Sequence, residues 1–410
     1  MNILILSYAC KPSAGSEYEV GWKVPTVMAR LHPEICVYVV TRGKSMSVEQ
    51  KEVAKLYSNL HYLHYDVPSW MKYPDEMGSK WGEQINYVVW QLMIRGKVKR
   101  WCEEYNIDVV HHLTFNQYRT PSPGYWMDKP FVFGPIGGAE CISPVFYQDL
   151  EPHTLRKERL RVKGYDRKVF RWFLSRRNSM KTILCSSLEN IKRLSPYVRN
   201  AQIKLVPAIG ISPDEFDSIT SNPSDKSFNI IYAGKVWDWK GLYVVLKSLA
   251  MSLSDKDDWK LKLVGIRFEE EQNRAKGWVK DLHLEDNVEL IPYISREELL
   301  DMEADCNLAV YPSFRDSGSM AVLEACALGC PSICFDAGGQ DIFPDEIVIK
   351  VPIQRTYEDT LQSFACKLSW AYNNRESLDV IGRKAREWAL SEMSWEKKVE
   401  TFVDEYLALK

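Results

Sequence analysis

Short apolar runs rich in β-branched residues alternate with longer helical patterns along this whole chain. The rhythm is typical of βαβ units and predicts parallel sheets covered by helices. In the first half, strands are predicted at residues 2–6, 35–40, 60–65, 108–112, 131–134, 182–185 and 203–206. A second series is predicted at residues 229–233, 260–264, 288–291, 307–311, 331–335 and 347–350. The chain is therefore expected to be an α/β protein with two doubly wound sheets.

The length of the chain also favours two domains. A single core seldom grows beyond about 250–300 residues, and this chain has 410. The stretch from Pro207 to Lys226 is dense in Gly, Pro, Ser and Asp and has no period, so we predict the link between the domains there. The predicted domains are an N-terminal one over 1–206 and a C-terminal one over 207–391. Residues 392–410 form a further helix with an apolar stripe that must be covered.

Composition excludes several classes of protein. The hydrophobic share of 45% and the charged share of 26% are those of an ordinary folded protein. A net charge of -2 gives no overall field for nucleic acid, which is not expected as a partner. The ten cysteines are scattered and are expected to be reduced. Residues 1–8 lack a basic leader, and no run reaches the ~18 apolar residues of a membrane span, so a soluble, cytoplasmic protein is expected.

The first ligand-binding candidate follows the strand that ends at Ala233. In doubly wound sheets, ligands bind beyond the carboxyl ends of the strands. Gly234, Lys235, Lys240 and Gly241 come after this strand, so two ammonium groups and two small residues lie at a strand-to-helix turn. The turn suits a diphosphate group. An exposed basic loop is the alternative interpretation.

The second candidate is the segment 311–339, which joins a strand, a polar turn, a helix and another strand. Gly318 and Ser319 are expected to open the helix, where free N–H groups and the helix dipole favour an anion. Asp316 lies ahead of the helix and Glu324 within it, roughly 9 Å apart along the axis. One carboxylate can meet a sugar while the other meets a ribose. A helix cap at Asp316 and a surface charge at Glu324 are the alternatives.

These residues resemble the retaining GT-B glycosyltransferases of family 4, also known as glycosyl transferases group 1. Two motifs of that family appear here in the same order. The donor signature resembles Gly234, Lys235, Lys240 and Gly241. The pair of acidic residues and the residues that follow it resemble Asp316, Glu324, Ala325, Gly329, Pro331, Gly338 and Gly339. Lys235 stands where the family commonly has arginine, so a bidentate phosphate contact becomes a point charge. Asp316 stands where glutamate is common and is one methylene shorter.

The resemblance implies a GT-B fold, with two Rossmann-like domains facing each other across a cleft and the C-terminal helix (392–410) returning to the N-terminal domain. It also implies retaining transfer from a nucleotide-diphosphate sugar to a glycan or lipid-linked acceptor, in surface polysaccharide or glycoconjugate biosynthesis. Neither a metal nor a cofactor is expected. The implied donor-binding residues are Gly15, Lys235, Lys240, Asp316, Gly318, Ser319, Met320 and Glu324.

Two histidines end the strand predicted at 108–112, and the family places a histidine there beside the transferred sugar. His111 and His112 should face opposite ways, so only one of them can enter the site. We favour His112, which is nearer the loop. With Lys240 and Asp316, the pair makes up the predicted catalytic set.

The acceptor side is predicted around two loops of the first domain. Gly15 and Ser16 precede a helix and resemble the glycine-rich loop of the family, although a plain helix cap explains Ser16 equally well. Glu17 follows them directly. Gly138 and Glu140 lie in a glycine-rich stretch after another strand and are expected to shape the acceptor pocket.

Residues 156–177 hold ten basic residues against Glu158 and Asp166. The segment is predicted to rest on anionic lipid at the inner face of a membrane or to grip a lipid-diphosphate acceptor. The alternative is an ordinary domain helix with a solvated basic face.

Three other functions stand against transfer, of which a phosphorylase or epimerase on the same fold would need free phosphate or no acceptor at all. A nicotinamide-dependent oxidoreductase is disfavoured, because no GxGxxG follows a predicted strand. A catalytically silent nucleotide-sugar-binding subunit of the same fold stays open as the alternative.

Overall fold

The structure is a computed structural model that describes residues 1–12, 16–71, 80–164, 168, 170–172, 180–220, 223 and 226–410. The chain divides into two compact units. The first consists of Met1–Ala139, Gly164–Ile209 and Trp395–Lys410, and the second of Glu140–Lys163 and Gly210–Ser394. The predicted division had placed residues 140–163 in the first domain, whereas they cluster with the second unit in the structure.

In its described part, the first unit contains a seven-stranded sheet in the order β3-β2-β1-β4-β5-β6-β7. All the pairings in this sheet are parallel. Its strands are β1 (Asn2–Leu6), β2 (Cys36–Arg42), β3 (Leu60–Tyr65), β4 (Val109–His112), β5 (Phe131–Ile136), β6 (Met180–Cys185) and β7 (Gln202–Leu205). The strand order reverses beside β1, which pairs with both β2 and β4.

Helices cover both faces of this sheet. They are α1 (Ser16–Leu31), α2 (Val48–Leu56), α3 (Lys80–Met93), α4 (Arg95–Glu104), α7 (Leu188–Leu194) and α14 (Trp395–Leu407). Alternate residues of β1 point to opposite faces. Ile3 and Ile5 belong to a core cluster with residues of α1 and α14, whereas Leu4 and Leu6 join another cluster with residues of α3 and α4. The alternation of apolar residues thus builds two cores on one sheet.

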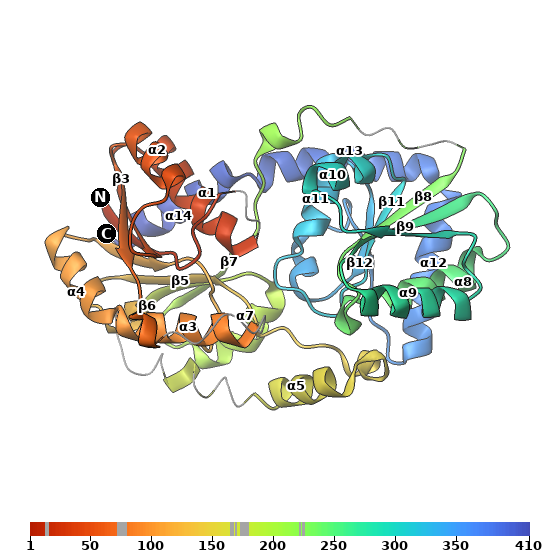
Figure 1. Ribbon diagram of the computed structural model, residues 1–410, viewed down its shortest axis with the longest axis horizontal. Helices are drawn as coiled ribbons and strands as arrows, with labels where there is room; N and C mark the ends of the chain where they lie inside the picture. Colours follow the sequence, from red (N-terminus) through yellow and green to blue (C-terminus); the bar gives the residue numbers. More distant parts are fainter. Residues whose placement is uncertain are drawn as a thin grey trace. The chain divides into compact units, whose positions relative to one another are not determined.

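The C-terminal helix α14 packs on the first unit, as predicted, where it lies beside α1 (Figure 1). Its apolar stripe of Trp395, Val399, Phe402 and Tyr406 is buried. His32 adds a polar contact to this helix through Glu400 at 3.0 Å.

The second unit contains a six-stranded sheet, counted over its described residues, in the order β10-β9-β8-β11-β12-β13. Its pairings are also parallel. The strands are β8 (Phe228–Ala233), β9 (Trp259–Ile266), β10 (Val288–Pro292), β11 (Leu308–Tyr311), β12 (Ser332–Phe335) and β13 (Ile349–Val351). The helices are α5 (Pro152–Lys163), α8 (Leu242–Leu253), α9 (Glu269–Asp281), α10 (Arg296–Ala304), α11 (Met320–Leu328), α12 (Tyr357–Asn373) and α13 (Arg375–Glu392).

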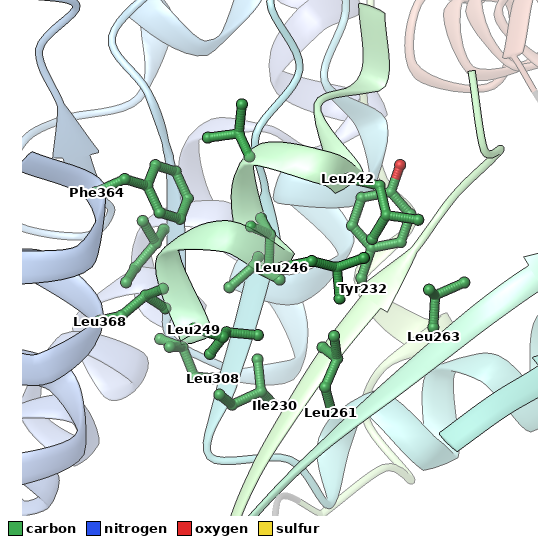
Figure 2. Close-up of a cluster of buried hydrophobic side chains, with 14 of the residues drawn as sticks. Ile230, Tyr232, Leu242, Leu246, Leu249, Leu261, Leu263, Leu308, Phe364 and Leu368 are labelled. Carbon is green, nitrogen blue, oxygen red and sulfur yellow. The ribbon is translucent and has the colours of Figure 1, made fainter. Parts of the chain in front are cut away.

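Helix α8 anchors the core of the second unit. Leu242, Leu246 and Leu249 repeat at helical spacing and form one apolar stripe. Figure 2 shows this stripe between the strands, which contribute residues such as Leu261, and helix α12, which contributes Phe364. This packing fixes α8, and with it the turn that joins β8 to α8. In the part of the chain that the structure describes, no helix is both long enough and apolar enough to cross a membrane.

Candidate functional site

A pocket of about 240 Å³ lies in the second unit, where the order of the strands reverses between β8 and β11. Beyond the carboxyl ends of such strands, doubly wound folds bind their ligands. The pocket is lined by residues that follow these strands and by the start of α11: Tyr232, Ala233, Gly234, Lys240, Tyr311, Ser313, Asp316, Ser319, Met320, Ala321, Val322 and Gln340.

The turn before α8 brings Lys240 to this pocket. Gly241 has a φ of +72°, and a Cβ atom there would overlap the carbonyl oxygen of Pro312. Glycine is therefore needed for the turn to approach the loop after β11. The N–H of Phe314 also donates to the carbonyl of Trp239 at 2.9 Å. Together these contacts hold the two loops side by side.

Lys240 and Asp316 form an ion pair in the pocket, with 2.8 Å between Nζ and Oδ2. The other carboxylate oxygen of Asp316 accepts hydrogen bonds from the N–H groups of Gly318 and Ser319, both at 3.2 Å. Burial alone would raise the pKa of Asp316, but Lys240 and these two N–H groups hold it below its usual value. Asp316 is therefore an ionised side chain with both oxygens engaged.

This arrangement corrects the expectation that the N–H groups of Gly318 and Ser319 are free for an anion. The carboxylate of Asp316 already occupies them, and α11 begins one residue later, at Met320. The first N–H groups of a helix have no partner within the helix. In α11 these are the N–H groups of Met320, Ala321 and Val322, three residues that line the pocket.

Ser319 is itself an unusual residue. Its φ of 43° is left-handed, and its hydroxyl oxygen is buried without a hydrogen-bond partner in the described structure. A non-glycine residue in this conformation is strained, and such strain is commonest at ligand-binding sites. The unpartnered hydroxyl lies in the wall of the pocket.

Lys235 and Arg267 add positive charge at the same edge of the sheet. Lys235 follows β8, and its ammonium lies 4.2 Å from the centre of the Trp237 ring. Burial lowers the pKa of Lys235, and the neighbouring charges of Arg267 and Lys240 lower it further. Lys235 is thus repelled by two neighbouring cations, and a bound anion would relieve this repulsion.

Glu324 does not line the pocket. It lies on α11 and forms an ion pair with Arg296, with 2.9 Å between Oε1 and Nε. Arg296 also contacts Glu215 at 3.1 Å. Asp316 therefore lies in the pocket beside Lys240, whereas Glu324 lies in a polar network outside it. The expectation that both carboxylates face one ligand site is not met in this structure.

Residues 140–163 hold the loop that carries Asp316. Phe146 stacks on Phe314 with 3.9 Å between ring centres. Glu158, only 1% exposed, pairs with Arg315 at 2.5 Å and also accepts the N–H of Ile142 at 2.8 Å. Both residues before Asp316 are thus fixed by this segment, which sequence analysis had assigned to the other domain.

Glu140 begins this segment and is buried. Its charge helps to sustain the positive charge of Arg315, whose pKa is lowered by burial and by Arg161. Glu140 therefore belongs to the second unit, whereas the predicted acceptor-side residue Gly138 stays in the first.

The two histidines of β4 are both fully buried in the first unit. His111 contacts the hydroxyl of Tyr406 at 2.5 Å and the carbonyl of Gly134 at 2.7 Å. His112 contacts the hydroxyl of Tyr87 at 3.1 Å and the carbonyl of Thr114 at 3.0 Å. The alternation along the strand is as predicted, but neither imidazole is open to a ligand in this structure.

Burial also sets the charge of these histidines. It lowers the pKa of His111 to about 4 and that of His112 to about 3, against smaller opposing effects of their carbonyl partners. Both rings are therefore neutral at neutral pH.

The other predicted residues of the first unit are only partly described. Glu17, at the start of α1, accepts the N–H of Phe115 at 2.9 Å, and burial raises its pKa despite this bond. Gly138 has a left-handed φ of 92°. Gly15 lies outside the described residues.

The basic segment 156–177 is described at residues 156–164, 168 and 170–172. In α5, Leu160 and Val162 are 51% and 45% exposed. Arg156 and Arg159 are exposed on the same helix, whereas Glu158 points inward.

Sequence analysis missed several residues of the pocket wall, notably Tyr311, Ser313 and Gln340. Gln340 directly follows the paired glycines that carried part of the resemblance. Its position directly after that pair was a signal that could have identified it. Arg267 follows β9, and its position after a strand was an unused signal of the same kind.

Comparison with known proteins gives one family match, which falls in the second unit. Residues 214–388 match the family model described as Glycosyl transferases group 1, and this range lies within the second unit. A curated D-inositol 3-phosphate glycosyltransferase from Pseudarthrobacter chlorophenolicus is 26% identical over 145 residues, which are 32% of this chain and 34% of that protein. The alignment thus spans about a third of the length of that relative.

Solved structures match over the whole chain. Sucrose-phosphate synthase from Thermosynechococcus elongatus is similar with a TM-score of 0.66 and 17% identity, over 100% of this chain and 98% of that one. HepE from Anabaena, solved in complex with UDP, gives a TM-score of 0.63 and 14% identity over 100% of both chains. At such identities the likeness shows the fold, which is GT-B. The family-model match thus lies in the second unit, and the likeness to solved structures shows that the fold of the chain is GT-B.

Proposed function

We propose that this chain transfers a sugar from a nucleotide-diphosphate sugar, and that the pocket of the second unit holds the diphosphate. The observation that carries the proposal is the placement of Lys240 and the start of α11 around one pocket, beyond the strands where the sheet order reverses. A cation and unpaired N–H groups in this arrangement suit a phosphate group. That HepE, a protein of the same fold, binds UDP supports the same ligand class.

We further propose that the reaction retains the configuration of the donor sugar, as in glycosyltransferase family 4. In a front-face displacement, the bond from the anomeric carbon to the diphosphate oxygen breaks while the acceptor oxygen bonds to the same face. The departing diphosphate oxygen takes the proton of the acceptor. Lys240, Lys235 and the N-terminus of α11 stabilise the charge that develops on the leaving group, so the proposal needs no metal and no cofactor.

Asp316 is proposed to contact the transferred sugar. It borders the pocket beside Lys240 and stays ionised, so it can accept hydrogen bonds from sugar hydroxyls. For Glu324 to reach the ribose, its ion pair with Arg296 must open or be shared.

Hydrolysis of the donor in the absence of acceptor tests this function. The full chain, given a panel of uridine, adenosine and guanosine diphosphate sugars, should slowly release the nucleoside diphosphate from one of them. Binding without any release would instead favour the catalytically silent subunit. A chain that binds none of these compounds would contradict both functions.

For the acceptor, we propose a glycan or a lipid-linked sugar bound by the first unit, in surface polysaccharide or glycoconjugate biosynthesis.

We also propose that the enzyme works in the cytoplasm and rests on the inner face of an anionic membrane through 156–177. Exposed Leu160 and Val162 among cations on α5 support this contact. In vesicle flotation, the wild type should rise with anionic but not with neutral vesicles, and Arg171→Glu should weaken this. No flotation of either protein would reject the contact.

A further inference from the structure

Gln340 lies in the wall of the pocket but has no part in the function described so far. It belongs to the 3-10 turn Gly338–Ile342 after β12. Gly338 has a φ of +59°, and the N–H of Gly339 donates to the carbonyl of Asp316 at 2.6 Å. The paired glycines thus press this turn against the backbone of Asp316, so that Gln340 reaches the same pocket.

The amide of Gln340 is only half satisfied. The residue is 1% exposed, and its Nε2 donates to the carbonyl oxygen of Tyr311 at 2.7 Å. Its Oε1 is buried and has no hydrogen-bond partner among the described residues. Rotating the amide by 180° would place Oε1 against the carbonyl oxygen of Tyr311, and two acceptors would then meet. The carbonyl of Tyr311 therefore fixes Nε2 towards itself and Oε1 away from it. A buried carbonyl without a partner is unfavourable and indicates a missing donor.

The neighbours of Gln340 hold it in this position. The hydroxyl of Tyr311 donates to Glu303 at 2.5 Å, and both side chains are buried. The strand residue that anchors the amide is therefore fixed at both its backbone and its side chain. An acceptor held in this way needs little ordering when a ligand binds.

We propose that Oε1 of Gln340 accepts a hydrogen bond from a hydroxyl of the transferred sugar and so selects the donor. This inference rests on the proposed function. A diphosphate offers only acceptors at neutral pH, so it cannot be the partner. Gln340 lines the pocket together with Asp316, the residue proposed to meet the sugar, and the N–H of the preceding Gly339 bonds to the carbonyl of Asp316. Glu324, proposed for the ribose, does not line the pocket.

Isothermal titration of the full chain tests the proposal. The ligands are the nucleotide sugar that raises the melting temperature most in the panel above, and the matching nucleoside diphosphate. Gln340→Met keeps the size and flexibility of the side chain but removes the acceptor, together with the Nε2 donor to the carbonyl of Tyr311. Its affinity for the nucleotide sugar should fall about 5- to 10-fold, and its affinity for the nucleoside diphosphate should change less than about twofold.

Ser248→Ala is the matched control. Its hydroxyl is also buried without a partner in the described structure, but it lies on α8 and does not line the pocket. This variant should bind both ligands as the wild type does.

Deoxy derivatives of the sugar identify the hydroxyl. One derivative should bind the wild type more weakly by the same factor, and Gln340→Met should show no further loss with it. Equal losses for the nucleotide sugar and the diphosphate, or no loss for either, would overturn the proposal. A wild type that binds no nucleotide sugar would instead contradict the proposed function.

Discussion

At the scale of single residues, Lys240 is the group with the most direct role in the proposed reaction. Its ammonium already pairs with Asp316 in the pocket that is proposed to hold the leaving diphosphate. A substitution there should therefore affect the chemical step more than the fold.

Lys240→Ala is predicted to lower turnover about 100-fold or more, the typical cost of losing one such electrostatic contact. Steady-state release of the nucleoside diphosphate measures this change. Lys256→Ala, which alters an exposed lysine paired with Asp255, serves as the control and should keep the wild-type rate. A fully active Lys240→Ala would remove this residue from the mechanism.

His111 makes the stability of the first unit dependent on pH. Because burial lowers its pKa to about 4, protons bind to it more readily in the unfolded chain, where the pKa is about 6.5. Its contribution to stability is therefore complete above about pH 6.5 and is lost as the pH falls towards 4.

His111→Gln keeps a polar side chain that does not titrate. The free energy of unfolding should then fall by about 2 kcal/mol less between pH 7 and pH 5 than it does in the wild type. Urea denaturation at the two pH values measures the difference. The control His153→Gln changes a histidine that is 61% exposed and should behave as the wild type. An equal fall in all three proteins would contradict the assigned burial.

Sequence analysis located the pocket better than it located the partners of individual side chains. Lys240, Asp316, Ser319 and Met320 do line one pocket. The ion pair of Glu324 with Arg296 was not predictable, because the two residues lie on different helices and only packing brings them together. Gly241 is a clearer case, since its left-handed turn explains why the lysine is followed by glycine.

At the scale of elements, residues 140–163 tie the loop of Asp316 to the rest of the second unit. One polar contact is the ion pair of Glu158, which is 1% exposed, with Arg315, which is 21% exposed. Removing Glu158 leaves Arg315 with mainly the charge of Glu140 to support it, and leaves the N–H of Ile142 without its acceptor.

Glu158→Ala should therefore lower the free energy of unfolding of the second unit by about 3 kcal/mol. Glu270→Ala, which removes an exposed pair with Arg274, should cost less than about 1 kcal/mol. The double variant Glu158→Gln with Arg315→Gln should recover part of the loss, because both charges of this pair are removed together. If Glu158→Ala were as mild as Glu270→Ala, the pair would not hold this loop.

The strands were predictable because their signal is local. All thirteen predicted strands correspond to β1–β13, with ends that differ by a few residues. The apolar runs and the residues between them carry this information within each segment. The packing of 140–163 on the second unit depends instead on distant contacts, such as that of Phe146 with Phe314, which no local pattern contains.

At the scale of the whole molecule, two parallel sheets that share the order of their first six strands have different roles in this account. The second unit matches the group 1 family model and contains the pocket, whereas the first is proposed to bind the acceptor. The presence of two sheets was predictable, because the alternation of strands and helices restarts in the second half of the sequence. The path of the chain between the units was not predictable. Residues 140–163 belong to the second unit and the chain returns to the first at Gly164, but no local pattern in the sequence indicates either change.

The account depends above all on where the diphosphate binds. A crystal structure of the full chain with the nucleoside diphosphate that binds it most tightly measures this directly. We expect a phosphate within about 2.7–3.2 Å of the ammonium of Lys240 and of an N–H group at the start of α11. A nucleotide bound elsewhere, with this pocket unchanged, would contradict the account.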